Sequence, residues 1–433
     1  MGLILAELAT ARGVALDLLG AVLRKRVPLD DALDHNPTLA ALETRDRAFA
    51  RLLVATVLRR LGQIDAIVTG FLSKGELPAG VALDILRLGA AQLLFLDTPP
   101  HAAVDTAVDL AAERRQSAAK GMVNAVLRRI GREGKELAAA QDAGRLNTPD
   151  WLWLAWRTAY GTGRTRALVE AHLHEPPLDL SVKADAAGWA ERLEATLLPT
   201  GSVRRPSGGA IVDLPGFADG AWWVQDAAAA LPARLLGDVA GKSVIDLCAA
   251  PGGKTAQLAA ARARVTAVDR SAPRLQRLAA NLQRLGLAAA TVAGDATGWQ
   301  PAAPADALLL DAPCSATGTI RRHPDVQRLK SPEDVQRLAG LQHRLLSRAV
   351  EMVRPGGWLV YCVCSLQPEE GEAQIARLLG ERSDVERVPV DASEVGGLAE
   401  LVTEAGDLRT TPGELATEGG LDGFFAARLR RRA

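Results

Sequence analysis

The sequence predicts an all-α N-terminal region followed by a doubly wound, mostly parallel α/β sheet. Apolar residues repeat at helical spacing through the first 135 residues, with no stretch of period-two alternation. From residue 241 onward, short strand patterns alternate with helical ones, as in a parallel sheet covered on both faces. A chain of 433 residues suits two or three domains, and we expect three, at 1–135, 136–240 and 241–433.

Composition indicates an ordinary globular chain. The 51 basic residues balance the 51 acidic ones, so a nucleic-acid partner can be inferred only from local basic patches. The N-terminal segment MGLILAELATARG lacks the basic region and cleavage pattern of a secretory signal. No apolar run reaches about 18 residues, so we expect a cytoplasmic protein without a membrane partner.

The four cysteines lie in the C-terminal half, at Cys248, Cys314, Cys362 and Cys364. They contain no CxxC spacing, so no metal site is expected, and a disulfide framework does not suit a cytoplasmic chain of this length. Cys248 and Cys362 are interpreted as small buried hydrophobic residues.

Helical periodicity predicts a bundle of five to seven helices in the N-terminal region. The predicted helices span residues 11–25, 45–61, 64–72, 80–94, 101–115 and 118–130. Basic residues cluster near several helix ends, for example at Arg128, Arg129 and Arg132. Because no acid–base constellation suited to catalysis occurs here, the region is interpreted as a binding module.

Residues 136–240 give weaker signals. Residues 134–147 are polar and alanine-rich and predict a linker or a loose helix. A helix capped by Thr148 and lined by Trp151, Trp153 and Trp156 is expected next, and another helix at residues 161–174. The run LDLSVK, residues 178–183, predicts a strand in a small mixed α/β segment.

The C-terminal region is organised around VIDLCAAPGGKT, residues 244–255. This stretch combines a strand, a turn containing Pro251, Gly252 and Gly253, and the start of a helix. Glycine lets a ligand approach the backbone closely, and the amide groups of the first helical turn face that ligand. The position at the end of a strand predicts a nucleotide-like cofactor.

The composition of this turn separates three cofactor classes. A phosphate-binding P-loop requires glycine at the position of Cys248, and a dinucleotide site requires G-x-G-x-x-G where this turn has AAPGGK. Pro251 within the turn, and the acid Asp246 two residues before Cys248, fit S-adenosylmethionine better.

Acidic residues end three successive predicted strands. Asp269 closes RVTAVD, Asp295 ends TVAGD and Asp311 ends ALLLD. An acid at the first position typically accepts hydrogen bonds from ribose hydroxyl groups. Because the carboxyl ends of parallel strands meet at one edge, we expect these acids to line one crevice.

Two cysteines also follow strand ends. Cys314 lies in DAPCSATGTIRRHPD, and Cys364 lies in YCVCSLQPEEG at the next strand end. A thiol at the reactive end of the cofactor is placed to attack an electron-poor carbon. Attack on carbon-6 of cytosine would make carbon-5 nucleophilic enough to accept a methyl group. The spacing alone does not distinguish which cysteine attacks.

These motifs closely resemble those of the Nol/Nop/Sun family of RNA cytosine-carbon-5 methyltransferases. The resemblance rests on DLCAAPGGKT, DAPCSATGTIRRHPD, YCVCSLQPEEG, DGFFAARL and WVQDAAA. The run GMVNAVLRRI, residues 121–130, is similar to the NusB-like domain of the bacterial RsmB/Sun branch. The resemblance implies a Rossmann-like S-adenosylmethionine methyltransferase domain, preceded by an all-α NusB-like RNA-binding bundle and a small α/β linking segment.

The resemblance also implies roles for single residues. Cys364 matches the nucleophile that bonds to carbon-6, and Cys314 matches the second cysteine, which assists deprotonation of carbon-5 and release of the product. Asp311 matches the acid that steadies the base and borders the cofactor. Asp269 would bind the ribose hydroxyls and Asp295 the adenine end. Backbone amides of the turn would hold the methionine part of S-adenosyl-L-methionine, at Cys248, Ala249, Ala250, Pro251, Gly252, Gly253 and Lys254.

The chain departs from the family pattern in two places. Val363 stands before the nucleophile where threonine is usual, and Gly371 follows the Pro-Glu-Glu run where asparagine is usual. Neither departure changes the identity of the thiol, although the first removes a hydroxyl group beside it.

The implied substrate is a cytidine of small-subunit (16S) ribosomal RNA, bound by a monomer. Arg321, Arg322 and His323 are candidate contacts to RNA phosphates near a flipped base; the alternative is an exposed arginine pair beside a turn histidine. Two other hypotheses stay open: the same chemistry on transfer RNA or large-subunit RNA, and an RNA-binding assembly factor without turnover.

Overall fold

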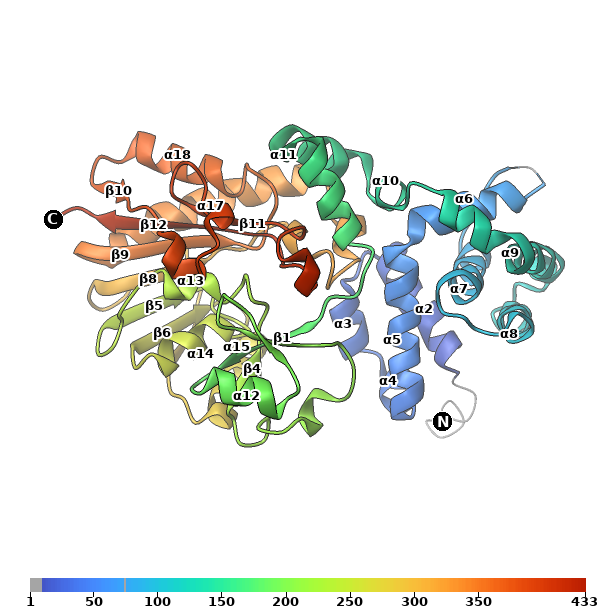
Figure 1. Cartoon of the computed structure of the whole chain (residues 1–433), viewed down its shortest axis with the longest axis horizontal. Coiled ribbons are helices and arrows are strands. Elements are labelled where there is room, and N and C mark those ends of the chain that lie inside the picture. Colours follow the sequence, from blue (N-terminus) through green and yellow to red (C-terminus); the bar gives the residue numbers. More distant parts are fainter. Residues whose placement is uncertain (1–9, 74) are drawn as a thin grey trace. The chain divides into compact units, whose positions relative to one another are not determined.

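The computed structural model describes residues 10–73 and 75–433, which are grouped into two compact units (Figure 1). The helical unit contains the described residues up to His174 together with Ile320–Lys330. The sheet unit contains Glu175–Thr319 and Ser331–Ala433. Part of the segment that was read for a secretory signal, residues 1–9, lies outside the described residues.

Helices build the helical unit, and the six helices predicted from periodicity are all present. Their ends lie close to the expected residues except at α9, which continues ten residues beyond the predicted end at Ile130. The α-helices of this unit are α2 (Ala11–Leu23), α3 (Leu29–Asp34), α4 (Pro37–Ala41), α5 (Thr44–Arg59), α6 (Leu61–Phe71), α7 (Val81–Phe95), α8 (Pro100–Glu113), α9 (Lys120–Ala140), α10 (Ala143–Asn147), α11 (Asp150–Ala171) and α16 (Val326–Leu329).

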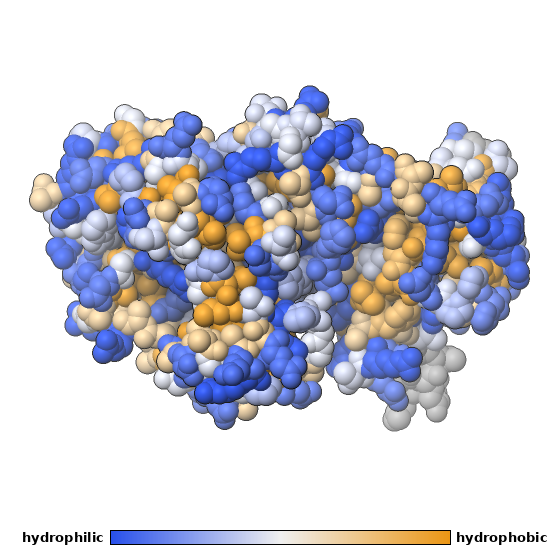
Figure 2. Space-filling view, in the orientation of Figure 1, coloured by the Kyte–Doolittle hydropathy of each residue, from blue (hydrophilic) through white to orange (hydrophobic). Residues whose placement is uncertain are grey.

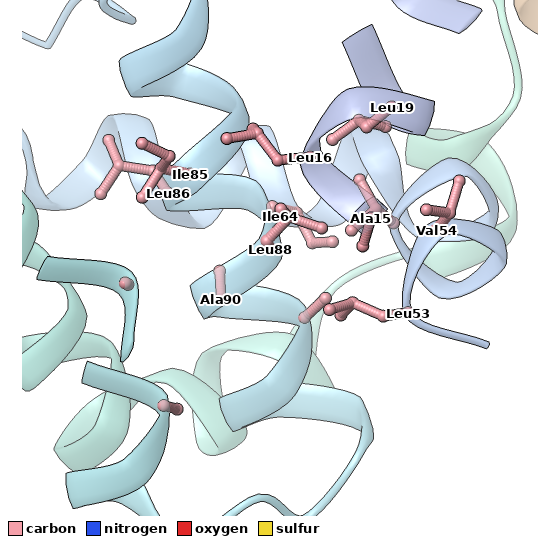
Figure 3. Packing of buried hydrophobic residues seen from close by; sticks show 14 of the residues in the cluster. Ala15, Leu16, Leu19, Leu53, Val54, Ile64, Ile85, Leu86, Leu88 and Ala90 are labelled. Carbon is pink, nitrogen blue, oxygen red and sulfur yellow. The ribbon is translucent and has the colours of Figure 1, made fainter. Parts of the chain in front are cut away.

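One hydrophobic core holds α2, α5, α6 and α7 together. Leu19, Leu53, Ile64 and Ile85 come from these four helices in turn, and each is fully buried. Figure 3 shows these side chains gathered in the interior of the bundle. Burial of apolar surface from four amphipathic helices stabilises the bundle more than helix propensity does.

The helices after residue 135 are tied to the bundle by polar contacts. The side-chain oxygen of Asn147 accepts a hydrogen bond of 3.1 Å from the backbone amide of Gln63, and Arg60 donates one of 3.0 Å to the carbonyl of Leu173. The structure thus groups residues up to 174 with the bundle, and residue 135 falls within α9. The division into three domains stays a prediction.

An eight-stranded sheet forms the centre of the sheet unit. Its strand order is β10-β12-β9-β8-β5-β6-β7, with β11 paired to β12. The pairs among β5 to β9 are parallel, and β10, β11 and β12 are antiparallel to their neighbours. The predicted doubly wound, mostly parallel sheet is therefore confirmed. Its strands are β5 (Ser243–Leu247), β6 (Arg264–Asp269), β7 (Ala290–Ala293), β8 (Ala305–Asp311), β9 (Val353–Val363), β10 (Val385–Arg387), β11 (Leu408–Thr410) and β12 (Phe424–Arg431).

Helices cover both faces of this sheet (Figure 1), and alternate strand residues pack against different layers of helices. On β8, Leu309 packs in one apolar cluster, while Leu308 and Leu310 pack in another. The first layer contains α13 (Leu231–Arg234), α14 (Gly253–Ala260) and α15 (Ala272–Leu285). The opposite layer contains α17 (Pro332–Met352) and α18 (Glu372–Glu381). Burial on both faces explains why these strands are nearly continuous apolar runs.

A small antiparallel sheet precedes the large one, in the order β2-β3-β1-β4. The predicted strand at 178–183 is confirmed as β1 (Leu178–Val182), and α12 (Ala186–Arg192) follows it in the chain. The other three strands are β2 (Thr196–Leu197), β3 (Val203–Arg205) and β4 (Trp222–Val224).

On the face shown in Figure 2, hydrophilic residues surround patches in which hydrophobic residues gather. Within residues 10–73 and 75–433, no helix is both long enough and apolar enough to cross a membrane.

Two neighbouring leucines on α5 test the core of the helical unit. Leu53 is fully buried, whereas Leu52 is 42% exposed. Leu53→Ala should lower the free energy of unfolding by about 2–5 kcal/mol, because it leaves a cavity. The matched control Leu52→Ala should change it by less than about 0.5 kcal/mol. Urea unfolding followed by far-ultraviolet circular dichroism measures both values, and equal losses would contradict the assigned core.

Candidate active site

The turn between β5 and α14 is shaped by two residues with left-handed backbone. Cys248 has φ 59° and Gly252 has φ 105°. A Cβ atom added to Gly252 would lie 2.6 Å from Cγ of Leu278, so only glycine fits there. The turn leads directly into the first residues of α14, whose amide groups have no partner within the helix.

Asp269, at the end of β6, anchors this turn. Its two carboxylate oxygens accept hydrogen bonds from the backbone amides of Ala250, at 3.1 Å, and Ser271, at 2.8 Å. The Arg274 side chain donates to the carbonyl of Ala250. Each oxygen of Asp269 can accept a second hydrogen bond, so the carboxylate is able to bind a ribose hydroxyl as predicted.

Asp246, on β5, was not among the site residues predicted from the sequence. It is fully buried, and the hydroxyl of Thr255 donates a hydrogen bond of 2.6 Å to its Oδ2. Among the described residues, its other oxygen has no hydrogen-bond partner. Burial raises the pKa of Asp246 to about 7, against the smaller opposing effect of the Thr255 hydrogen bond. The sequence signal for Asp246 was its place two residues before Cys248, which supported the S-adenosylmethionine prediction without giving this acid a role.

Lys254, which is buried, and Asp311, which is partly exposed, form an ion pair between the first turn of α14 and the end of β8. Nζ of Lys254 lies 2.8 Å from Oδ2 of Asp311 and 4.9 Å from the centre of the Phe424 ring. Burial, the largest single effect, lowers the pKa of Lys254, but the attraction of Asp311, Cys362 and Cys364 and the hydrogen bond to Asp311 together exceed it, so the pKa is raised. Lys254, expected only to hold the cofactor, therefore also fixes the orientation of Asp311.

The two cysteine loops meet. Sγ of Cys314 lies 3.4 Å from Sγ of Cys364. The hydrogen bond to Cys364 and burial raise the pKa of Cys314 well above its ordinary value. Burial also raises the pKa of Cys248, to about 12, and that of Cys362. Cys362 is buried, as expected for a packing residue, whereas Cys248 is only half-buried.

A polar cluster beside the thiols was missed by sequence reasoning. Glu370 is fully buried and accepts hydrogen bonds from Ser315 and Ser365, each of which directly follows one of the paired cysteines. The repeated Cys-Ser dipeptide was the sequence signal for this cluster.

The two departures from the family pattern have local explanations. Gly371 packs so closely that a Cβ atom there would lie 2.9 Å from Cγ of Phe425 and 2.6 Å from Nη2 of Arg409. Val363 is fully buried in the core on the α17 side of the sheet, opposite Phe425 in the register of β9 and β12. An apolar side chain suits that position.

The other predicted site residues make their contacts with residues other than the two cysteines. Asp295 is exposed and accepts hydrogen bonds from the amide and hydroxyl of Thr297, which lower its pKa. Arg321 is only 1% exposed, so its guanidinium group does not face solvent. His323 lies 3.3 Å from Asp30. All three residues from Arg321 to His323 belong to the helical unit, and their contact with RNA stays a prediction.

No group of three or more potential metal ligands occurs in the part of the chain that the structure describes.

The raised pKa of Asp246 makes stability depend on pH. Between its ordinary pKa of 3.8 and its folded-state value of about 7, the folded state keeps a proton that the unfolded state has lost. The stabilising contribution is therefore present at low pH and is lost as pH rises through this window. The measured quantity is the free energy of unfolding of the natural protein minus that of Asp246→Asn. This difference should fall between about pH 4 and pH 7 and stay constant above pH 7. Urea titrations at a series of pH values test this, and a difference that rises would contradict it.

Comparisons with known proteins agree with both halves of the fold. A family model described as 16S rRNA methyltransferase RsmB/F matches residues 233–430, and the NusB family model matches residues 9–132. A methyltransferase homolog protein from Pyrococcus horikoshii has a solved structure that is 27% identical to this chain. It covers 66% of this chain and 96% of its own, with a TM-score of 0.55.

Two relatives match over nearly their full length. Ribosomal RNA small subunit methyltransferase B of Vibrio cholerae is 35% identical over 90% of this chain and 91% of its own. The probable ribosomal RNA small subunit methyltransferase B of Synechocystis is 35% identical over 98% of this chain and 99% of its own. With its NusB domain and its doubly wound sheet, the chain therefore belongs to the RsmB/F family of 16S rRNA methyltransferases.

Proposed function

We propose that this chain methylates carbon-5 of one cytidine in 16S ribosomal RNA through a covalent bond between Cys364 and carbon-6. The coarser activity, methylation of small-subunit ribosomal RNA with S-adenosyl-L-methionine, follows from family membership. The observation that carries the finer proposal is the pair of thiols, 3.4 Å apart, on the loops that follow β8 and β9.

The residues of the β5–α14 turn fit S-adenosyl-L-methionine. When bound, this cofactor supplies an electrophilic methyl group. The left-handed residues Cys248 and Gly252 turn the backbone, and the first amides of α14 would face the carboxylate of the methionine part. Asp269 would accept hydrogen bonds from the ribose hydroxyls, and Asp295 would lie toward the adenine.

The contact between the two thiols, 3.4 Å apart, supports a shared task in which each has its own role. Cys364 matches the nucleophile of the family pattern, so it is the residue that attacks carbon-6. After methylation, removal of the carbon-5 proton lets the electrons return to the ring, and the bond from carbon-6 to Cys364 breaks. Cys314, in contact with Cys364, is placed to assist that release.

Asp311 would steady the cytosine during the attack. Its carboxylate can accept hydrogen bonds from the exocyclic amino group of the base, and Lys254 holds it in place through the 2.8 Å ion pair. An extruded base is required, because carbon-6 is not accessible to a thiol within a stacked helix.

Cys364→Ala should abolish turnover and leave the cofactor site intact. We expect the rate of methyl transfer to 16S ribosomal RNA to fall by at least about 1000-fold, because no other thiol replaces the nucleophile. Transfer from tritium-labelled cofactor measures the rate, and calorimetry should show unchanged cofactor affinity. Retained turnover in this variant would overturn the covalent mechanism.

Cys314→Ala should trap the enzyme on its substrate. Without the assisting thiol, the adduct between Cys364 and RNA should persist and appear as a denaturation-resistant band on a gel. The double variant Cys314→Ala with Cys364→Ala provides the control, since it lacks the attacking sulfur and should give no band. If the single variant also gives none, Cys314 has no role in release.

A further inference from the structure

A buried carboxylate joins the two cysteine loops. Glu370 is fully buried, and its carboxylate accepts four hydrogen bonds. Oε1 accepts from the amide of Ser315, at 2.9 Å, and from Nε2 of Gln342, at 3.0 Å. Oε2 accepts from the hydroxyls of Ser315, at 2.5 Å, and Ser365, at 2.6 Å. One carboxylate thus binds the residue that follows Cys314 and the residue that follows Cys364.

Further contacts make the join between the loops a network. The hydroxyl oxygens of Ser315 and Ser365 lie 3.1 Å apart, and the hydroxyl oxygens of Thr317 and Ser365 lie 3.2 Å apart. The amide of Gly318 donates a 3.1 Å hydrogen bond to the carbonyl of Cys364. Gln342 of α17 also donates to the carbonyl of Pro313, so the helix supports the Cys314 loop from a second side.

The network depends on the Glu370 carboxylate at its centre. A carboxylate removed from water is stable only when hydrogen bonds replace its hydration. The same low dielectric strengthens those bonds. Removing the carboxylate would leave two buried hydroxyls, the backbone amide of Ser315 and one N–H of Gln342 without this acceptor, and would release both loops at once.

We infer that Glu370 is a positioning residue that holds Cys314 and Cys364 in the geometry the reaction needs. The inference rests on the proposed function, because it gives both thiols a task. Glu370 touches neither thiol and acts through Ser315 and Ser365. Its negative charge also contributes, after the Cys364 hydrogen bond and burial, to the raised pKa of Cys314.

Three variants test this role. Glu370→Ala removes the carboxylate. Glu370→Gln keeps the shape, since its amide oxygen can accept at the Oε1 position while its NH₂ group donates to the two serine hydroxyls. Glu369→Ala is the matched control, because Glu369 is the preceding residue and is exposed. Thermal unfolding and cofactor affinity are measured for each variant, and Ser365→Ala replaces Glu370→Ala if the latter does not fold.

The first readout is the distance between the thiols, measured without RNA. Diamide oxidises two neighbouring thiols to a disulfide, and its azo bond takes up the two electrons and two protons released. Mass spectrometry of tryptic peptides gives the rate at which Cys314 and Cys364 are joined. We expect this rate to fall about 10-fold or more in Glu370→Ala, because a displacement of about 1 Å is costly for reacting groups. It should remain close to that of the natural protein in Glu370→Gln and Glu369→Ala.

The second readout is methyl transfer to 16S ribosomal RNA. In Glu370→Ala, kcat should fall by about 10- to 100-fold while KM for the RNA is unchanged, since the residue does not contact substrate. Equal rates in Glu370→Ala and Glu369→Ala, in either readout, would overturn the inference. Equal losses in Glu370→Gln and Glu370→Ala would also overturn it, because the hydrogen-bonded shape would then not matter.

The two proposals fail separately. If Cys364→Ala retains turnover, the covalent mechanism is wrong, yet the diamide experiment still reports whether Glu370 holds the thiols together. If Cys364→Ala is inactive and Glu370→Ala behaves like Glu369→Ala, only the positioning role is wrong.

Discussion

The parallel pairing of β8 with β9 is the constraint on which the site depends. Its register places Asp311 opposite Cys362, and the amide of Ala312 continues the ladder with a 2.9 Å hydrogen bond to the carbonyl of Cys362. Both strands therefore end at the same level of the sheet. Cys314 and Cys364 follow within a few residues, so their loops are brought together by backbone hydrogen bonds before any side-chain contact contributes.

Buried charge then sets the details that the backbone leaves open. The Lys254–Asp311 pair connects the α14 turn to the end of β8, and Glu370 connects the loops after β8 and β9. Buried charges are weak sources of stability, because desolvation offsets most of the attraction. Their value here is orientation, because the ion pair and the hydrogen bonds fix where each charged group points. These groups lie at or after the ends of β5, β8 and β9, which are neighbours in the sheet.

Much of the sheet could be predicted from the sequence because local signals agree with the fold. Sequence patterns predict a strand over residues 243–247 and a helix over residues 272–285, and β5 and α15 have these bounds. Helix α15 begins after the Ser271 cap and ends at left-handed Gly286. Prediction failed where local signals are weak. The last ten residues of α9 have little apolar periodicity, and Leu137 is 46% exposed. The short strands β10 and β11 depend on pairing with β12, which no local pattern specifies.

In the site, the sequence identifies the groups that react better than the groups that hold them. Thiols and strand-end acids are recognised by residue type, whereas Glu370 binds a serine 55 residues earlier in the chain, and that pairing exists only after β8 and β9 align. Side-chain direction is equally hidden, as the buried Arg321 shows. Yet the supporting residues lie within the reacting motifs, because a serine follows each cysteine and Glu370 lies six residues after Cys364. Because Cys364 and Glu370 lie in one short segment, the single pairing of β8 with β9 brings both the nucleophile and its supporting carboxylate to the Cys314 loop.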